Sequence, residues 1–261
     1  MSGIRARAIR SIFAARRALN RAAELARYVA VGLMRSDELR TAIATAWTGF
    51  MPDERGVPST ELFAWESDVY LRVLKPTDRI LLVGCGTGRD LIALLELGYR
   101  ADGLELVAAC AAAARARLAE RGLAAVVATG AIETAPLDAV YDVFIFSYWC
   151  YSYIPQSATR THILRRLRER LPPDGRIVIP YIPAPSAVRP ILITVARLLG
   201  RLTRSGWQPE AGDVFLDGPT AVGLHYQHHF GEDEIEREVR AAGLRIRHHH
   251  RAAAPALIVT L

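Results

Sequence analysis

The feature that most constrains the fold is a stretch in which an apolar run, a glycine-rich turn, a helical pattern and a second expected strand follow one another. Residues 79–83 (RILLV) read as a buried strand, and residues 83–88 (VGCGTG) form the turn directly after it. The helical pattern then stops at Gly98, and residues 101–106 form the second expected strand. A strand, a helix and a strand in this order predict a parallel βαβ unit and an α/β fold.

The alternation of strands and helices continues along the chain. Further strands are expected at 125–128, 141–147, 176–182, 244–250 and 256–261. The expected helices are an alanine-rich one that ends at Gly122 and two others at 158–170 and 232–242. The short link between the last two strands favours antiparallel pairing. Residues 224–230 fit either a strand or a loop.

The first 75 residues and one later segment lie outside this alternation. The expected elements are helices at 4–34, 37–50, 60–74 and 191–204, and a loop at 52–58. Ser36 fits the N-cap of the second helix, with Asp37 and Glu38 in its first turn. We therefore expect an N-terminal helical cap (1–75) and an α/β domain (76–261) with a cap insertion at 183–224.

Positive charge is concentrated at the N-terminus. Residues 1–40 hold nine arginines and three acidic residues, so their net charge of +6 equals that of the whole chain. In residues 4–34, apolar residues recur at steps of four and three, which predicts an amphipathic helix with arginines over the rest of its surface. Two basic amphipathic helices suit either a cap over an acceptor or an anionic membrane surface. Nucleic acid is disfavoured, because the aromatic and basic pattern of RNA-binding modules is absent.

Other functional classes are excluded by composition. No run approaches eighteen uncharged apolar residues, so no membrane-spanning helix is expected. The three cysteines are too few and too scattered for a disulfide framework, which favours the cytoplasm. His248, His249 and His250 are consecutive, so on a strand their side chains alternate between faces and cannot hold one metal ion. No metal site is predicted.

The glycine turn is typical of nucleotide-binding loops, because glycines let a ligand approach the backbone and the following helix offers free N–H groups. A dinucleotide fingerprint, GxGxxG, would have its third glycine at the position of Arg89, whereas here it is Gly88. The pattern GxGxG favours a nucleoside whose substituent is not a phosphate. Glu105 ends the second strand, 21 residues after Gly84, where a carboxylate can accept hydrogen bonds from both ribose hydroxyls.

The stretch ILLVGCGTGRDLIALLELGYRADGLEL resembles the start of a class I S-adenosylmethionine-dependent methyltransferase. The resemblance covers residues 60–182 well and residues 232–261 in outline. It implies a Rossmann-like doubly wound sheet of seven strands, with order 3-2-1-4-5-7-6 and strand 7 antiparallel. The N-terminal helices and the insertion after strand 5 would be additions to this fold, residues 76–261 would form the methyltransferase domain, and S-adenosylmethionine would be the cofactor.

The resemblance also implies a set of site residues. The glycines would line the amino-acid part of the cofactor, Glu105 its ribose, residues 131–132 its adenine, and residues 146–148 its sulfonium. The implied cofactor-binding residues are Gly84, Cys85, Gly86, Thr87, Gly88, Asp90, Glu105, Leu106, Ala131, Ile132, Phe146 and Ser147. Many relatives have an acid two residues before the first glycine, where this chain has Leu82, so that Asp90 would supply the carboxylate. No acid follows the third strand at residues 130–132, so backbone groups would hold the adenine.

The acceptor side has a weaker signal. The aromatic stretch 147–155 (SYWCYSYIP) follows the fourth strand at the edge where open α/β sheets bind ligands. Its rings either pack under the cap or stabilise a sulfonium and orient a flat acceptor, and Tyr148 is the residue expected nearest the methyl group. His225, His228 and His229 are either loop histidines without a role or the source of a general base, for which we select His228.

The predicted function is transfer of a methyl group from S-adenosylmethionine to a small-molecule or lipid-like acceptor by in-line displacement. One alternative is a non-catalytic cofactor-binding partner or scaffold protein of the same fold. Another is aminopropyl transfer, which is disfavoured because no acidic polyamine motif follows the fourth strand. The expected location is the cytoplasm, with peripheral membrane contact through the basic helices. The sequence predicts neither the acceptor nor the oligomeric state.

Overall fold

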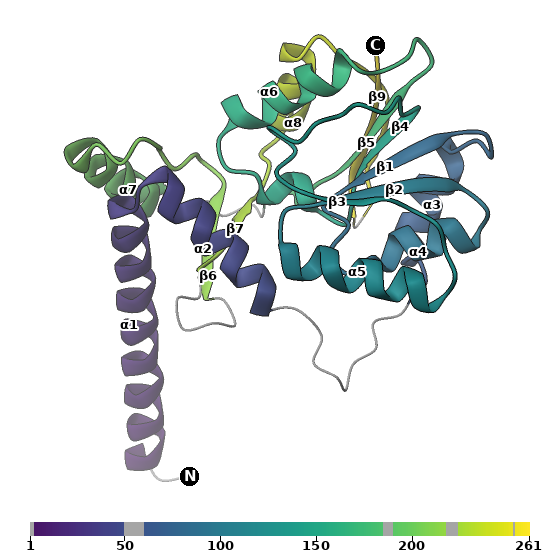
Figure 1. Cartoon of the computed structure of the whole chain (residues 1–261). Helices are drawn as coiled ribbons and strands as arrows, with labels where there is room; N and C mark the ends of the chain where they lie inside the picture. The colour runs from purple at the N-terminus through teal and green to yellow at the C-terminus, as the bar shows by residue number, and fades with distance from the viewer. Residues whose placement is uncertain (1–2, 50–59, 185–189, 218–223, 253) are drawn as a thin grey trace. The chain divides into compact units, whose positions relative to one another are not determined.

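The computed structural model of the chain describes residues 3–49, 60–184, 190–217, 224–252 and 254–261 (Figure 1). The chain divides into two compact units, a smaller one of Met1–Thr41 with Val188–Ala211 and a larger one of Ala42–Ala187 with Gly212–Leu261. The expected boundary at residue 75 therefore differs from the division of these units, since residues 42–75 fall in the larger one. The loop expected at 52–58 lies outside the described residues.

The larger unit contains a seven-stranded sheet of order β3-β2-β1-β4-β5-β9-β8. Its strands are β1 (Arg79–Val83), β2 (Arg100–Glu105), β3 (Val127–Thr129), β4 (Val143–Phe146), β5 (Arg176–Pro180), β8 (Arg245–His250) and β9 (Ala256–Thr260). Strand β9 runs antiparallel to both β5 and β8, and the first five strands are parallel. Counted along this sheet, the order is the expected 3-2-1-4-5-7-6, which confirms the predicted fold.

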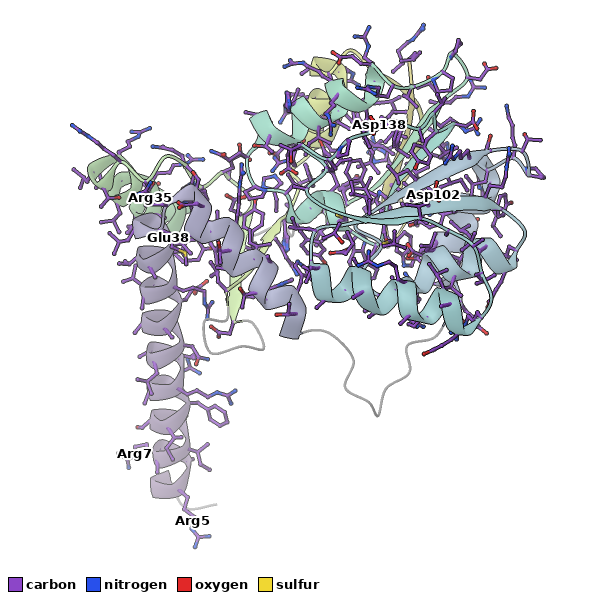
Figure 2. The ribbon with its side chains drawn as sticks, viewed as in Figure 1. Arg5, Arg7, Arg35, Glu38, Asp102 and Asp138 are labelled. Atoms are coloured by element: carbon purple, nitrogen blue, oxygen red, sulfur yellow. The ribbon has the colours of Figure 1, made fainter. Side chains whose placement is uncertain are left out.

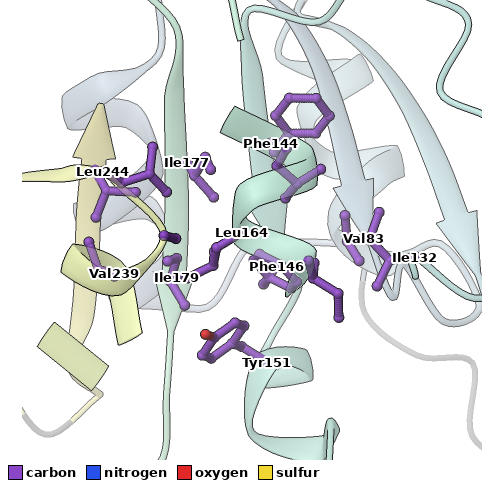
Figure 3. Packing of buried hydrophobic residues seen from close by; sticks show 14 of the residues in the cluster. Val83, Ile132, Phe144, Phe146, Tyr151, Leu164, Ile177, Ile179, Val239 and Leu244 are labelled. Carbon is purple, nitrogen blue, oxygen red and sulfur yellow. The ribbon is translucent and has the colours of Figure 1, made fainter. Parts of the chain in front are cut away.

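Helices cover both faces of the sheet (Figure 1). They are α3 (Ala64–Val73), α4 (Arg89–Glu96), α5 (Ala108–Glu120), a short 3₁₀ helix η1 (Cys150–Tyr153), α6 (Ser157–Arg168) and α8 (Glu234–Ala241). Alternate residues of β1 point to opposite faces, so that Ile80 and Leu82 pack with α4 and α5, whereas Leu81 and Val83 pack with α6 and α8. Figure 3 shows the second of these cores, in which Phe146 and Tyr151 are among the buried rings.

The carboxylate of Asp102, in the middle of β2, joins this strand to the elements beside it (Figure 2). It accepts hydrogen bonds from Arg79 Nη2 at 3.0 Å, from the hydroxyl of Tyr141 at 3.1 Å and from the backbone N–H of Val126 at 2.9 Å. These contacts tie β2 to the start of β1 and to the segments that precede β3 and β4.

Two further strands, β6 (Asp213–Asp217) and β7 (Leu224–His228), pair antiparallel and form a separate ribbon in the larger unit. For the segment of β7 the sequence predicted either a strand or a loop, and the structure shows a strand. Strand β6 was not predicted. The ribbon is held by the opposed rings of Phe215 and Tyr226, both buried, whose centroids lie 5.6 Å apart. A five-residue strand with acidic residues at both ends has too short an alternation to be distinguished from a loop in the sequence.

The smaller unit is helical and contains α1 (Gly3–Leu33), the start of α2 (Ser36–Gly49) and α7 (Pro190–Thr203). The last turns of α1 pack on α7, where Gly32 lies so close to Ala196 that an added Cβ would be 2.7 Å from its carbonyl oxygen. Among the described helices of the chain, none is long and apolar enough to cross a membrane.

Helix α2 begins one residue earlier than expected and is capped differently. The backbone N–H of Arg35 donates to Glu38 Oε2 at 2.7 Å, and the carbonyl of Arg35 accepts the hydrogen bond of Leu39 N (Figure 2). Arg35 thus occupies the N-cap position, and the side chain of Glu38 does the capping from the third helical position. The expectation that Ser36 is the N-cap was wrong, because Ser36 already lies inside the helix.

Candidate cofactor and acceptor site

The turn between β1 and α4 adopts a backbone conformation that favours glycine, with φ of 73°, 56° and 85° at Gly84, Gly86 and Gly88. An added Cβ at Gly84 would lie 2.4 Å from Cys150 Sγ, and one at Gly88 would lie 3.2 Å from Ala114 Cβ. At Gly86 a Cβ would meet no described atom within 4 Å. The outer glycines are therefore needed for close packing, and Gly86 borders open space on the side where a ligand would lie.

The carboxylate of Glu105 lies directly beside this open position. Its Oε2 accepts a hydrogen bond from the backbone N–H of Gly86 at 2.8 Å, and its Oε1 accepts one from Val107 N at 2.8 Å. Burial raises the pKa of Glu105, and the backbone hydrogen bonds oppose that rise. The next side chain, Leu106, is 49% exposed at the end of β2. The strand end, the turn and the acid thus meet as the sequence predicted.

Asp90 connects the first turn of α4 to the end of β4. The hydroxyl of Ser147 donates to Asp90 Oδ2 at 2.5 Å, and the Asp90 side chain is almost fully buried. Burial and the nearby Glu66 carboxylate raise the pKa of Asp90 to about 6, although Arg89 opposes them. Since β1 lies between β2 and β4, these residues lie where the order of the sheet reverses, which is the usual ligand position in such folds.

Arg89 holds α3 against the start of α4. Its guanidinium makes a two-pronged ion pair with the fully buried Glu66, with hydrogen bonds of 2.6 and 2.5 Å, and lies 4.2 Å over the ring of Phe63. The sequence analysis missed this pair, which explains why an arginine stands where a dinucleotide fingerprint has glycine. The two residues lie 23 positions apart, so no local sequence pattern links them.

Two of the expected cofactor residues in the turn direct their side chains elsewhere. The thiol of Cys85 packs against β2, where an added Cβ at Gly103 would lie 2.7 Å from it. The carbonyl of Thr87 accepts a hydrogen bond from Arg117 of α5 at 3.0 Å, and its hydroxyl lies 3.3 Å from the same Nη1 atom. These residues therefore shape the turn, and only their backbone remains to contact a cofactor.

The expected contacts of Phe146 and Ile132 also need correction. The ring of Phe146 is fully buried and packs edge-on against Tyr151, with centroids 5.1 Å apart. Ile132 lies in the same core beside Val83, as Figure 3 shows. Their side chains cannot flank a sulfonium or an adenine, because both belong to the apolar layer under α6. Ala131, by contrast, is half-buried after β3.

A cavity of about 450 Å³ adjoins the end of β4 in the larger unit. Its walls come from the segments that follow β4 and β5, from β7 and from the residue before β9. The lining residues are Tyr148, Trp149, Tyr153, Ile182, Pro183, Gln227, His229 and Pro255. Six of these are aromatic, aliphatic or proline, so the cavity suits a flat and mostly apolar molecule.

Tyr148 stands at the boundary between this cavity and the residues around Asp90, since it follows Ser147 directly. Its backbone has φ of 53°, which is unusual for a residue with a side chain. Its ring lies 4.2 Å from that of Trp149 and 6.0 Å from that of Phe63. Burial raises the pKa of Tyr148, so its phenol stays neutral near neutral pH. The role expected of Tyr148 stays a prediction.

His228 does not fit the role of a base that contacts the acceptor. It is fully buried, with Nδ1 2.8 Å from Asp213 Oδ1 and Nε2 3.1 Å from Glu234 Oε1. Burial lowers the pKa of His228, but hydrogen bonds to the two carboxylates outweigh it and raise the pKa. Both ring nitrogens are occupied, so His228 joins the ribbon to α8. Its neighbour His229 lines the cavity instead.

Comparisons with known proteins agree with this geometry. Residues 80–175 match the model of a methyltransferase domain family. A protein-L-isoaspartate O-methyltransferase of Methylorubrum extorquens is 36% identical over 115 residues, which cover 42% of this chain and 44% of that protein. The chain thus matches less than half the length of this curated relative.

Solved structures with the same fold include an S-adenosylmethionine-dependent methyltransferase of Methanosarcina mazei, with a TM-score of 0.58, 18% identity and coverage of 77% of this chain and 96% of that one. Another is the glycopeptide N-methyltransferase MtfA in complex with S-adenosylhomocysteine, with a TM-score of 0.56, 16% identity and coverage of 77% and 92%. At these identities the likeness establishes the fold.

The sheet order, the glycine turn and the matched family model together define a class I methyltransferase domain. The family model covers residues 80–175 of the chain, and the neighbour MtfA was solved in complex with S-adenosylhomocysteine and with S-adenosylmethionine.

Proposed function

We propose that this protein transfers a methyl group from S-adenosylmethionine to a small-molecule or lipid-like acceptor bound in the cavity beside Tyr148. The observation that carries the proposal is the position of Glu105, whose carboxylate lies 2.8 Å from the backbone of Gly86 at the open side of the turn. A second acid, Asp90, lies at the reversal of the sheet order, next to the residue that precedes Tyr148.

Each part of the site has a distinct task in this reaction. When bound, S-adenosylmethionine supplies a methyl group already activated by a positive sulfur. Glu105 accepts hydrogen bonds from the ribose hydroxyls, and Asp90 faces the amino-acid end. The aromatic walls of the cavity orient the acceptor and exclude water, so that the main contribution of the protein is alignment. Tyr148 presents a ring to the sulfonium side, where cation–π attraction favours positive charge.

The test is a transfer assay with S-adenosylmethionine that carries a deuterated methyl group, incubated with small-molecule and lipid extracts. Mass spectrometry should find a product that carries the label with the wild-type protein. Glu105→Ala should bind the cofactor about ten- to a hundredfold more weakly, since charged hydrogen bonds contribute about 1.5–3 kcal/mol. The matched control is Glu120→Ala, which removes an exposed acid of α5 and should leave transfer unchanged. Cofactor binding without any labelled product across broad extracts would favour a non-catalytic partner or scaffold protein.

The smaller unit is the part that we propose brings the enzyme to an anionic surface or to its acceptor. It holds thirteen arginines and four acidic residues. On α1 the side chains of Ile12 and Leu19 are 67% and 70% exposed, and on α7 those of Ile191 and Leu202 are 73% and 72% exposed. Exposed apolar side chains beside arginines are typical of helices that lie in a membrane interface. In this proposal the protein is cytoplasmic and contacts the membrane peripherally.

A further inference from the structure

One cavity-lining histidine has a ring nitrogen without a partner. Nδ1 of His229 is buried and has no hydrogen-bond partner among the described residues. The other nitrogen, Nε2, lies 2.9 Å from Oε1 of Gln227, and both residues line the cavity beside Tyr148. Nε1 of Trp149, in the same cavity wall, is likewise buried without a hydrogen-bond partner among the described residues. Buried polar atoms in proteins are nearly always hydrogen-bonded, so an unpaired acceptor and an unpaired donor in one cavity wall indicate a polar ligand contact.

The network around His229 fixes which nitrogen carries the proton. In the orientation of the Gln227 amide, its side-chain oxygen accepts a hydrogen bond, so that Nε2 of His229 is the protonated nitrogen. The amide nitrogen of Gln227 in turn lies 2.9 Å from Nε2 of His225, to which it donates. Nδ1 of His229 therefore holds a lone pair, which can accept a hydrogen bond or a proton.

Burial and neighbouring groups keep the imidazole ring of His229 neutral. Burial and the neighbouring His228 both lower the pKa of His229, and burial also lowers that of His225. The titratable groups that face the cavity from the segment after β4 are the phenols of Tyr148 and Tyr153, and burial raises the pKa of both. No Asp, Glu, Lys or Arg is among the described lining residues. A neutral acceptor is therefore favoured over a charged one.

We propose that the acceptor is a neutral, flat, mostly apolar molecule with an acidic hydroxyl of the phenol or enol type, and that His229 takes the hydroxyl proton through Nδ1. In this step the acceptor oxygen forms a bond to the methyl carbon while the carbon–sulfur bond breaks and leaves its electron pair on sulfur. The proton passes to Nδ1, and the resulting imidazolium loses it to water after the methylated product leaves. This inference rests on the proposed methyl transfer and names its substrate class and base.

The experiment measures methylation of a panel of simple neutral phenols, matched anilines and matched benzoates with deuterated cofactor. Wild-type protein should methylate phenols in preference to the other two classes. His229→Asn keeps a polar group near the position of Nδ1 but cannot take a proton, and it should lower kcat/KM for phenols roughly 100-fold or more at neutral pH. His248→Asn, the same change at an exposed histidine of β8, should have no effect.

The pH profile separates a base from a packing role. In the wild-type protein, kcat/KM should rise through a pKa below 6.5 and then stay level. In His229→Asn it should instead keep rising toward the ionisation of the phenol itself, at about pH 10. A variant with the wild-type rate and profile would overturn the role of His229. A protein that transfers methyl groups to anilines or benzoates but to no phenol would overturn the substrate class.

A readout independent of turnover is the ¹⁵N NMR spectrum of the histidine rings. The Nε2–H tautomer is expected for His229, and the Nδ1 resonance should move when a phenol binds in the presence of S-adenosylhomocysteine. An Nδ1–H tautomer, or no phenol effect on Nδ1, would contradict the proposal. A protein that binds no S-adenosylhomocysteine at all would instead contradict the proposed function, so the two failures are distinguishable.

Discussion

At the scale of single residues, the three glycines of the turn have different roles, since two are needed for packing and one borders the space for a ligand. Gly84 and Gly88 are restricted by Cys150 and Ala114, whereas Gly86 has the same type of backbone but open space around the position of its missing Cβ. The sequence motif treats the three glycines alike. Only the structure indicates that a side chain at the middle one, apart from its backbone strain, would enter the cofactor volume without meeting a described neighbour.

Gly86→Leu should abolish cofactor binding and lower stability only modestly. A matched control exists in Gly98, which also has positive φ and no described atom within 4 Å of an added Cβ, but lies at the end of α4. Gly98→Leu should therefore show a similar loss of stability, about 1–2 kcal/mol for the left-handed backbone, with normal binding. Calorimetric titration and chemical denaturation check both variants. Equal cofactor affinity in the two variants would mean that the ligand does not lie against Gly86.

The raised pKa of Asp90 predicts that stability and cofactor affinity both depend on pH. Its pKa is raised by burial from 3.8 to about 6, so ionised Asp90 opposes folding above pH 6, and this penalty is relieved as the pH falls from about 6 toward 4. A cofactor with a positive amino group should favour the ionised form. S-adenosylmethionine affinity should therefore weaken as the pH falls through 6, and Asp90→Asn should remove most of this dependence. Calorimetry across that range tests it, and a wild-type affinity independent of pH would place the amino group elsewhere.

At the scale of helices and strands, one buried ion pair fastens the two helices on the acceptor face. Arg160 of α6 and Glu238 of α8 are both buried and lie 2.7 Å apart, and the hydroxyl of Tyr151 donates to the same carboxylate at 2.8 Å. Because Tyr151 belongs to η1, this cluster also positions the segment after β4 that carries Tyr148 and Trp149. The element that lines the cavity is thus anchored from beneath.

Glu238→Ala should destabilise the protein by about 3–5 kcal/mol, because it leaves the guanidinium of Arg160 buried without its carboxylate. The double variant Arg160→Met with Glu238→Leu should recover much of this loss, since it removes both charges together. Denaturant unfolding of the single and double variants measures the difference. A single variant as stable as the wild type would show that water reaches this cluster.

The main sheet could be predicted from the sequence because its strands have local sequence marks. The β6–β7 ribbon and the roles of the histidines have no such marks. Strands β1, β2 and β4 are buried on both faces and each is followed by a helix, so their boundaries are marked in the sequence. Strand β6 has no such marks. The difference between His228 and His229 depends on Asp213 and Glu234, which lie 15 and 6 residues from His228, so spacing alone could not separate the two histidines.

At the scale of the whole molecule, the two units carry different kinds of surface. Of the described side chains of α1, only those of Tyr28 and Val31 are buried, and both lie in its last two turns. Most of α1 therefore packs neither in the core of its own unit nor on α7. A truncation should therefore end before Tyr28, because a deletion that keeps Tyr28 and Val31 preserves the packing on α7.

Removal of residues 1–24 should leave a folded, cofactor-binding protein that no longer sediments with anionic vesicles. The full chain should bind vesicles of phosphatidylcholine mixed with phosphatidylserine at low salt, and less at high salt, since each arginine near such a surface contributes about 1 kcal/mol and salt screens it. Vesicles of phosphatidylcholine alone are the control. Equal sedimentation of the full and shortened chains would contradict a membrane role for α1, and loss of cofactor binding would assign α1 to the fold.

The central claim is that the turn at Gly86 and the carboxylate of Glu105 bind S-adenosylmethionine, and calorimetric titration of the purified full chain tests it most directly. The account predicts that S-adenosylmethionine and S-adenosylhomocysteine each bind at one site per chain and that NAD binds negligibly. Binding of NAD more tightly than either, or no binding of both adenosyl compounds by the folded protein, would contradict it.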